Sequence, residues 1–482
     1  MFPVKPDHVR RLNFVSKIYP NLSSPLGTEF ARLGADDHDG ELFLRGKSRN
    51  KDLLSFFGFI SKSQRGASSH VQLPLFRRCQ KKLVSLVEQE LESIGAQEML
   101  MPTLIPKKLW LRSKRVERQP DALDSVYQLT DRNEIALLLG PTFEESTTQL
   151  VGDLDASYEH QLPLMLYQTS QKFRDEMQPR FGLLRSSEFL MNDLYSFDAT
   201  LDNAKATYTL MTSVYERIFK RLGLDCIRCE SNPGDIGGTI SHEFQLPLSS
   251  GEDMVVRCRS CNHSYNIEMS NSTDIKDEQD SSRAVCIKCK NSNVDSYVSL
   301  ELAHTFLLSD TYTRPMNVSI KASDGGRRFY EMGCYGLGLT RILGAGLDLF
   351  SIGPKQSAES SDIPQMRWPS ETEPYKFGLV TPAKRSKQYH GGSSDFVEKM
   401  VLSILDRTSH EVDILIEDRD KEGISRRVAK LQSIGIPNII VVGKRFLDDP
   451  PMFEVLSLTK DKQNYDQHWF TEEQLYDYIQ KR

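Results

Sequence analysis

The sequence contains no uninterrupted apolar run of about 18 to 20 residues, which is the length that a membrane-spanning helix requires. It also lacks a basic excess, because its 61 Lys and Arg are outnumbered by 66 Asp and Glu, and the net charge is -5. Binding of nucleic acid through bulk charge is therefore excluded, and any RNA contact must come from local patches. Eight cysteines in 482 residues are too few for a disulfide scaffold.

The first twenty residues have a basic and partly apolar composition. Lys5, Arg10, Arg11 and Lys17 are opposed by a single acid, Asp7. This composition is typical of a transit peptide and predicts an address in the mitochondrial matrix. The alternative is a plain basic tail on a cytoplasmic protein. We assign residues 1–50 to this N-terminal extension.

The remaining length predicts two further domains. Between residues 75 and 94, apolar residues recur at helical spacing up to Gly95, which indicates a long amphipathic helix. Two strand-like runs between residues 164 and 198 flank a turn-rich segment and indicate two antiparallel strands with a long loop. Residues 51–355 form the predicted main domain, and the breaker-rich residues 356–374 form a linker. Residues 375–482 alternate buried strands with helices, such as SDFVEKMVLSILDRT, and predict a small α/β domain with a partly parallel sheet.

Charged and aromatic residues gather around the turn-rich segment. The run Phe173-Arg174-Asp175-Glu176 is followed by Arg185, Phe189 and Asp193 at intervals of four residues, which would place these three on one face of a strand. A guanidinium can bind a phosphate through two hydrogen bonds, and a phenyl ring can stack on a base. This segment is therefore a candidate ATP site that includes Arg174, Arg185 and Phe189.

A second candidate segment is GCYGLGLTR, which runs from Gly333 to Arg341. Small glycines let a ligand approach the backbone, and Arg341 supplies a fixed positive charge. Taken alone, a glycine pair before a helix more often reflects close packing than a nucleotide site.

In combination, the order of these segments is far more specific. The helix and strand at residues 72–102, the F-R-x-E loop and the G-x-G-x-x-R segment resemble the three motifs of class II aminoacyl-tRNA synthetases. The stretches GPTFEE, KFRDEMQPRFGLLRSSEFLMNDLYSFD, GDIGGTISHEFQLP and EMGCYGLGLTRILGA are similar to those of bacterial and mitochondrial prolyl-tRNA synthetases. The resemblance implies an α+β fold, with an antiparallel sheet flanked by helices and a C-terminal α/β anticodon-binding domain. It also implies a homodimer built on the first motif.

The resemblance implies roles in ATP-dependent activation of L-proline and its ligation to tRNA(Pro). Arg174 corresponds to the residue that binds the α-phosphate, and Arg341 to the one that binds the γ-phosphate. Glu176 orients the adenine end or the amino acid, and Phe189 stacks on adenine. Mg²⁺ would accompany ATP and neutralise phosphate charge.

A second group of residues resembles the proline pocket. Thr142 and Glu144 correspond to the pair that receives the secondary ammonium of proline, although an acid at a helix N-terminus would also explain Glu144. Gly237, Gly238, His242 and Cys334 resemble residues that shape this pocket. For His242 and Cys334, a role as ordinary core residues is equally compatible with the sequence.

Four cysteines in an insert at residues 250–300 have the spacing of zinc knuckles. Cys258 and Cys261 form one Cys-x-x-Cys pair, and Cys286 and Cys289 form the other, which favours a structural Zn²⁺ over four free thiols. A third pair, Cys226 and Cys229, lies in a strand-like run that would point its members to opposite faces.

The same interval is too short for the editing domain that many bacterial relatives insert there, so we expect no hydrolysis of mischarged alanine in cis. In the C-terminal domain, Arg419, Lys444 and Arg445 are candidate anticodon contacts, or ordinary surface charges. Two alternatives remain. One is a class II synthetase for another amino acid, such as threonine, and the other is a non-catalytic synthetase-like RNA-binding protein.

Overall fold

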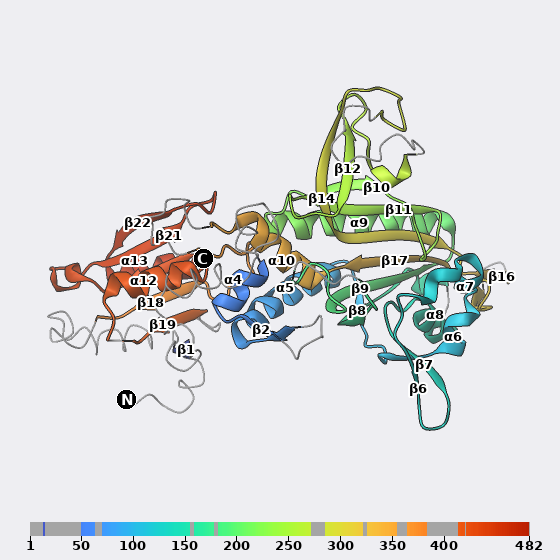
Figure 1. Ribbon diagram of the computed structural model, residues 1–482, viewed down its shortest axis with the longest axis horizontal. Coiled ribbons are helices and arrows are strands. Elements are labelled where there is room, and N and C mark those ends of the chain that lie inside the picture. The colour runs from blue at the N-terminus through green and yellow to red at the C-terminus, as the bar shows by residue number, and fades with distance from the viewer. Residues whose placement is uncertain are drawn as a thin grey trace.

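The computed structural model describes residues 13–14, 50–62, 70–154, 159–177, 182–270, 285–321, 325–353, 364–382, 413–419 and 421–481. Figure 1 shows a large body built on one long sheet and a smaller C-terminal body beside it. None of the helices in these ranges combines the length and apolar character that a membrane crossing needs.

A nine-stranded sheet organises the larger body, in the order β11-β10-β13-β12-β14-β17-β9-β8-β4. Most neighbours are antiparallel, whereas the pairs β4–β8 and β10–β13 are parallel. Its strands are β4 (Gln97–Glu98), β8 (Leu164–Phe173), β9 (Glu188–Asp198), β10 (Ile227–Glu230), β11 (Ile240–Pro247), β12 (Asp253–Cys258), β13 (Ser264–Asn266), β14 (Val294–Ser309) and β17 (Glu331–Leu337).

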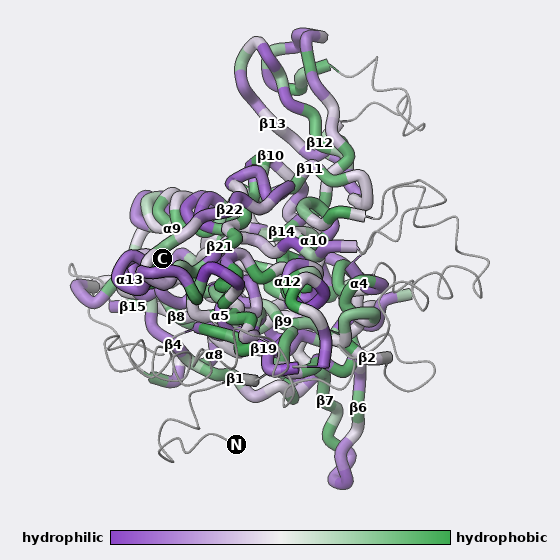
Figure 2. Tube along the Cα trace, turned by 90° about the vertical axis from the view of Figure 1, so that its left-hand side faces the viewer, coloured by the Kyte–Doolittle hydropathy of each residue, from purple (hydrophilic) through white to green (hydrophobic). Residues whose placement is uncertain are grey.

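Short sheets complete the larger body: β2 (Ile60–Lys62) with β3 (His70–Gln72), β5 (Leu104–Pro106) with β7 (Ala136–Leu139) and β6 (Gln128–Thr130), and β15 (Ser319–Lys321) with β16 (Arg327–Phe329). Its helices are α4 (Asn50–Phe56), α5 (Pro74–Glu92), α6 (Lys107–Arg112), α7 (Arg115–Arg118), α8 (Glu144–Asp153), α9 (Leu201–Leu222) and α10 (Leu339–Phe350). The β6–β7 hairpin and the arm formed by β12, β13 and the start of β14 extend away from the central sheet, as both views show (Figures 1 and 2).

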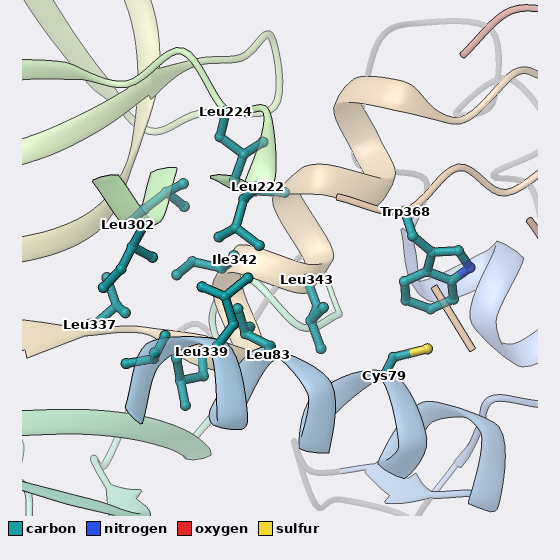
Figure 3. Packing of buried hydrophobic residues seen from close by; sticks show 14 of the residues in the cluster. Cys79, Leu83, Leu222, Leu224, Leu302, Leu337, Leu339, Ile342, Leu343 and Trp368 are labelled. Carbon is teal, nitrogen blue, oxygen red and sulfur yellow. The ribbon is translucent and has the colours of Figure 1, made fainter. Parts of the chain in front are cut away.

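The main hydrophobic core lies where α5, α9 and α10 cover the sheet. Leu83 of α5, Ile342 of α10 and Leu302 of β14 have exposures of 2% or less and gather at this place (Figure 3). Helix α5 is amphipathic and ends before Gly95, whose φ of +81° suits glycine. The prediction of a long helix at residues 75–94 is therefore confirmed.

The C-terminal body contains a six-stranded sheet in the order β1-β19-β18-β20-β21-β22. The strands are β1 (Asn13–Phe14), β18 (Phe377–Val380), β19 (Ile414–Glu417), β20 (Asn438–Val441), β21 (Phe453–Leu458) and β22 (Tyr465–Phe470), with helices α12 (Ile424–Ser433) and α13 (Glu472–Gln480). The first four strands are parallel and the last two antiparallel, which confirms the predicted partly parallel sheet.

The two bodies are joined by packing and by charge. Leu431 and Ile436 from the C-terminal body belong to the same buried cluster as Leu83 of α5. Asp413 accepts hydrogen bonds from Arg78 and Lys82 of α5. The helix expected at residues 394–408 and the loop expected at residues 270–282 fall outside the described residues, apart from Ser270. The same holds for most of residues 1–50 and for the first part of the linker.

Candidate active site

A cavity of about 590 Å³ opens between β9, β14, β17 and the N-terminus of α8. Eight of the eleven residues proposed from the sequence for ATP and proline binding line it: Thr142, Glu144, Arg174, Glu176, Arg185, Phe189, Cys334 and Arg341. They come from segments that are distant in sequence, and the antiparallel pairing of β8, β9, β17 and β14 brings them together.

Glu144 is the first residue of α8, and its side chain is fully buried at one end of the cavity. The hydroxyl oxygen of Thr142 lies 2.7 and 2.8 Å from its two carboxylate oxygens, and the thiol of Cys334 donates to it at 3.1 Å. Burial works to raise the pKa of Glu144, but Arg115 and the hydrogen bonds from Thr142 and Cys334 hold that pKa below its usual value. The site therefore holds an ionised carboxylate, as a bound ammonium requires.

Arg115 and Glu145 lie directly behind Glu144. The Nη2 atom of Arg115 donates to Glu144 at 2.8 Å, and its Nε atom lies 3.2 Å from a carboxylate oxygen of Glu145. The hydroxyl of Ser113 donates to the same oxygen, Oε1 of Glu145, at 2.7 Å. Two buried acids thus share one buried guanidinium.

The other end of the cavity carries the positive charge. Arg341, at the start of α10, donates to the backbone oxygens of Leu184 and Glu301 at 2.9 Å each, which fixes the direction of its guanidinium. Arg174 follows β8, and burial together with the nearby charge of Arg341 lowers its pKa. Two like charges held near each other favour an anionic ligand between them.

Glu301 is the acid of this cationic end. Its carboxylate lies 3.6 Å from Nη1 of Arg341 and 3.1 Å from Nδ1 of His304. Burial acts to raise the pKa of Glu301, but His304, Arg341 and Arg174 lower it to about 2. This carboxylate is therefore ionised near neutral pH.

Glu176 and Arg185 are bound to each other. The Nε atom of Arg185 donates to Glu176 at 2.8 Å, and its Nη1 atom donates to Glu252 at 2.9 Å. The expected alignment of Arg185, Phe189 and Asp193 on one strand face is wrong at its first member, because β9 begins at Glu188 and Arg185 lies in the preceding loop. Phe189 and Asp193 lie on β9, and both line the cavity.

Asp193 is held by a buried network. Its carboxylate lies 2.5 Å from Nζ of Lys172 and accepts hydrogen bonds from Gln168 at 2.9 Å and from Tyr195 at 2.8 Å. The hydroxyl of Tyr195 in turn accepts from the backbone N–H of Phe143 at 2.9 Å. This network connects β8 and β9 to the turn that carries Thr142.

The segment from Pro233 to Ile236 lines the cavity, and two glycines carry it back to β11. Gly237 and Gly238 have φ values of +81° and +111°, and a Cβ on Gly238 would lie 2.6 Å from the backbone oxygen of Leu307. Like these two glycines, His242 is a predicted proline-pocket residue that does not line the cavity. Its Nδ1 atom instead lies 2.8 Å from the hydroxyl of Tyr208 on α9, so its geometry does not support contact with proline.

The four predicted metal ligands lie together at the end of the arm. The sulfur atoms of Cys258, Cys261, Cys286 and Cys289 all lie within 4.8 Å of one another. Cys226 and Cys229 are not part of this or any other described ligand cluster, and β10 contains Cys229 but not Cys226.

Comparison with known proteins agrees with this geometry. Residues 127–350 match the family model of the class II tRNA synthetase core domain (G, H, P, S and T). The probable mitochondrial proline–tRNA ligase of Mus musculus is 38% identical over 386 residues, which are 80% of this chain and 76% of the relative. The proline–tRNA ligase of Neorickettsia sennetsu is 34% identical over 402 residues, which are 79% of this chain and 84% of the relative. The chain belongs to the proline–tRNA ligase family.

A solved member of this family has the same fold at low sequence identity. The prolyl-tRNA synthetase of Giardia lamblia, solved with prolyl-adenylate, aligns with a TM-score of 0.67 at 16% identity and covers 89% of this chain and 77% of its own. The predicted α+β class II synthetase fold is therefore confirmed.

Several residues of the site were missed by the sequence analysis. Glu145 stands beside Glu144 in GPTFEE, and Glu301 and His304 stand in ELAHTF. The ionisable residues in these two stretches could have indicated a role in the site. Arg115 lies in a four-residue helix without a recognisable motif. No sequence motif indicates that this helix lies at the cavity, and its position there is given by the tertiary fold of the proline–tRNA ligase family.

Proposed function

We propose that this protein activates L-proline with ATP and transfers it to tRNA(Pro). One observation carries the proposal. A single cavity holds a buried, ionised Glu144 at one end and the guanidinium groups of Arg174 and Arg341 at the other. The secondary ammonium of the amino acid requires the negative charge, and the phosphates of a nucleoside triphosphate require the positive charges, within one cavity.

The proposed chemistry needs no nucleophile from the protein. The carboxylate of proline attacks the α-phosphorus of ATP, pyrophosphate leaves, and the ribose hydroxyl at the end of tRNA(Pro) then displaces AMP. Arg174 stabilises the charge that develops on the α-phosphate, and Arg341 holds the γ-phosphate. Glu144 and Thr142 hold the ammonium, which places the carboxylate toward Arg174.

The residues present also fit Mg²⁺, which prefers oxygen ligands. Glu301 is an ionised carboxylate at the cationic end of the cavity, beside Arg341 and Arg174. We propose that Glu301 would hold the ion. When bound, Mg²⁺ neutralises phosphate charge.

The residues of the arm fit a structural Zn²⁺. A tetrahedral site with Zn–S bonds of about 2.3 Å places its sulfur atoms about 3.8 Å apart. The pairs Cys258–Cys289 and Cys261–Cys286 have sulfur separations of 3.5 and 3.6 Å. Each Cys-x-x-Cys turn is followed by a residue with positive φ, Asn262 or Lys290, so the two turns have matching shapes.

We propose three further properties of the protein. A mitochondrial location is supported by the names of relatives from mouse, rat, human and fission yeast and by the basic N-terminal residues. A homodimer is supported by three exposed apolar side chains, those of Leu100 after β4, Leu104 on β5 and Leu129 on β6. Residues 375–482 are proposed to bind the anticodon. Arg445 stacks on Trp469 at 4.3 Å and can present this surface to a base, whereas Arg419 is bound to Glu417.

Proline-dependent exchange of pyrophosphate into ATP tests the proposed function. We expect exchange with proline and not with threonine, and we expect Arg174→Ala to lower it by about 100-fold or more. Exchange with threonine alone would favour the alternative synthetase. No exchange with any amino acid, together with intact binding of tRNA, would favour a non-catalytic RNA-binding protein.

The handling of alanine forms a second test. Because a pocket cannot strongly reject a smaller substrate, some alanine activation is expected. Between β11 and β14, the described residues form the cysteine arm and contain no separate hydrolytic domain. We therefore expect no enzyme-dependent hydrolysis of Ala-tRNA(Pro), and rapid deacylation would contradict the absence of editing.

A further inference from the structure

The amine end of the cavity contains more buried charge than proline binding alone explains. Arg115, Glu144 and Glu145 are each at most 3% exposed, and the one guanidinium contacts both carboxylates. Burying three charged groups is costly unless each is paired. With both acids ionised, the group carries one surplus negative charge.

Arg115 also connects three walls of the cavity. Its Nη2 atom donates to the hydroxyl of Tyr312 at 2.7 Å, and that hydroxyl donates to the backbone oxygen of Ile236 at 2.7 Å. The guanidinium lies over the ring of Trp110 at 4.3 Å, which restricts its position further. Helix α7, the N-terminus of α8 and the segment that ends at Ile236 therefore meet at one cation.

The other charged groups near this cluster do not balance its surplus. Lys172 is paired with Asp193, and burial raises the pKa of the Cys334 thiol, which keeps it neutral. Arg118 lies 5.5 Å from the ring of Tyr312 and donates to the backbone oxygen of Ser113 at 2.8 Å. Arg174 interacts with the charge of Glu144, but Glu301 and Glu176 act on it more strongly. Among the described residues, the surplus charge is therefore left to a ligand.

We propose that Arg115 and Glu145 are positioning residues for the amine of the substrate: Glu145 neutralises Arg115, so that the charge of Glu144 stays available to the ammonium. This inference rests on the proposed function. Without Glu145, Arg115 and Glu144 would form an ion pair of zero net charge, and no net negative charge would remain for the ammonium. Without Arg115, the carboxylate of Glu144 would lose the group that directs it.

The proposal predicts a specific pH dependence. Burial and the charge of Glu144 raise the pKa of Glu145 against the opposing effect of Arg115, whereas the pKa of Glu144 is lowered. Acid therefore protonates Glu145 first and removes the surplus charge. Binding of an ammonium favours the ionised form, so the KM for proline should rise as the pH falls and Glu145 takes up a proton.

Pyrophosphate exchange by the full-length protein can separate this role from a purely structural one. We expect Glu145→Gln to raise the KM for proline by about tenfold, to leave the KM for ATP unchanged, and to remove the pH dependence of the KM for proline. The double variant Arg115→Gln/Glu145→Gln restores a single surplus negative charge. Its KM for proline should fall below that of Glu145→Gln without reaching the wild-type value, because Glu144 then lacks the group that directs it.

The outcomes are distinguishable. A double variant that binds proline more weakly than Glu145→Gln, while both unfold at the wild-type temperature, would overturn the charge account. Should the double variant fail to fold, Glu145→Asp serves instead, since it keeps the negative charge beside Arg115. It is expected to raise the KM for proline less than Glu145→Gln does, and an equal increase in the two variants would overturn the charge account. Absence of proline-dependent exchange in the wild-type protein would refute the proposed function itself. If the wild-type protein exchanges and only the variants depart from expectation, this inference alone is refuted.

Discussion

The ring of Phe189 lies beneath the guanidinium of Arg174, with 5.2 Å between the ring centroid and Cζ. Phe189 is fixed by the pairing of β9 with β8, and Arg174 by the backbone hydrogen bond from its N–H to Ser187 at 2.9 Å. The ring therefore supports the cation on which the proposed α-phosphate contact depends and leaves the remaining part of its surface for a base.

Replacement of this ring should weaken nucleotide binding selectively. We expect Phe189→Ala to raise the KM for ATP in pyrophosphate exchange by about tenfold, because stacking of a base on an aromatic ring contributes about 1–3 kcal/mol. Phe189→Tyr keeps the ring and should retain the wild-type KM. Equal increases in the KM for ATP and for proline in Phe189→Ala would instead indicate a general disturbance of the cavity.

Removal of two cysteines from the arm should release a metal ion. We expect about one zinc ion per purified chain, and its loss from the double variant Cys258→Ser/Cys286→Ser together with a lower unfolding temperature. Cys226→Ser is the matched control, since it alters another Cys-x-x-Cys pair outside the cluster. Wild-type protein without zinc, or equal metal loss in the control, would refute the metal site.

Loosening of the contact between the two bodies should separate the two half-reactions. Asp413 binds Arg78 and Lys82 of α5 and accepts the backbone N–H of Lys376 at 3.0 Å. We expect Asp413→Asn to cost about 1–3 kcal/mol in the free energy of unfolding and to lower tRNA charging more than pyrophosphate exchange.

The control for this experiment is Asp448→Asn, which changes an exposed acid of the C-terminal body. Equal losses of exchange and charging in Asp413→Asn, at an unchanged unfolding temperature, would show that this contact does not orient the C-terminal body.

The stability of the folded protein at acidic pH should depend on His242. Burial, assisted by Arg228, His263 and His304, lowers the pKa of His242 to about 4. The unfolded chain binds this proton at its ordinary pKa of about 6.5, so the contribution of neutral His242 is complete above that pH and is lost as the pH falls toward 4.

Denaturant unfolding as a function of pH measures this contribution. We expect the wild-type protein to lose up to about 2 kcal/mol more than His242→Gln between pH 6.5 and pH 4. Asp198, whose pKa is raised to about 6 by burial, acts in the opposite direction but is present in both proteins. His468→Gln, at an exposed position, should behave like the wild type. Parallel pH profiles for the wild type and His242→Gln would contradict the prediction.

Local patterns were sufficient for much of the fold. The apolar spacing of residues 75–94 and the alternating runs of residues 164–198 follow from the periods of helices and strands, so α5, β8 and β9 could be predicted. The spacing between Arg185 and Phe189 fits a strand and predicts that both lie on one strand face. The strand β9 begins only at Glu188, so Arg185 lies outside it. The resemblance assigns His242 to the proline pocket, whereas in the structure its Nδ1 atom lies 2.8 Å from the hydroxyl of Tyr208, a contact that the sequence does not reveal.

The sequence alone determined the family, the order of the motifs and eight residues of the cavity, because these are properties of residue type and spacing along the chain. Only the tertiary structure decided which charges meet. Arg115, Glu145 and Glu301 come from separate elements, and their ionisation depends on burial and on neighbours that long-range strand pairing provides. Electrostatic energy depends on distance in space, and the chain position of a residue does not give that distance.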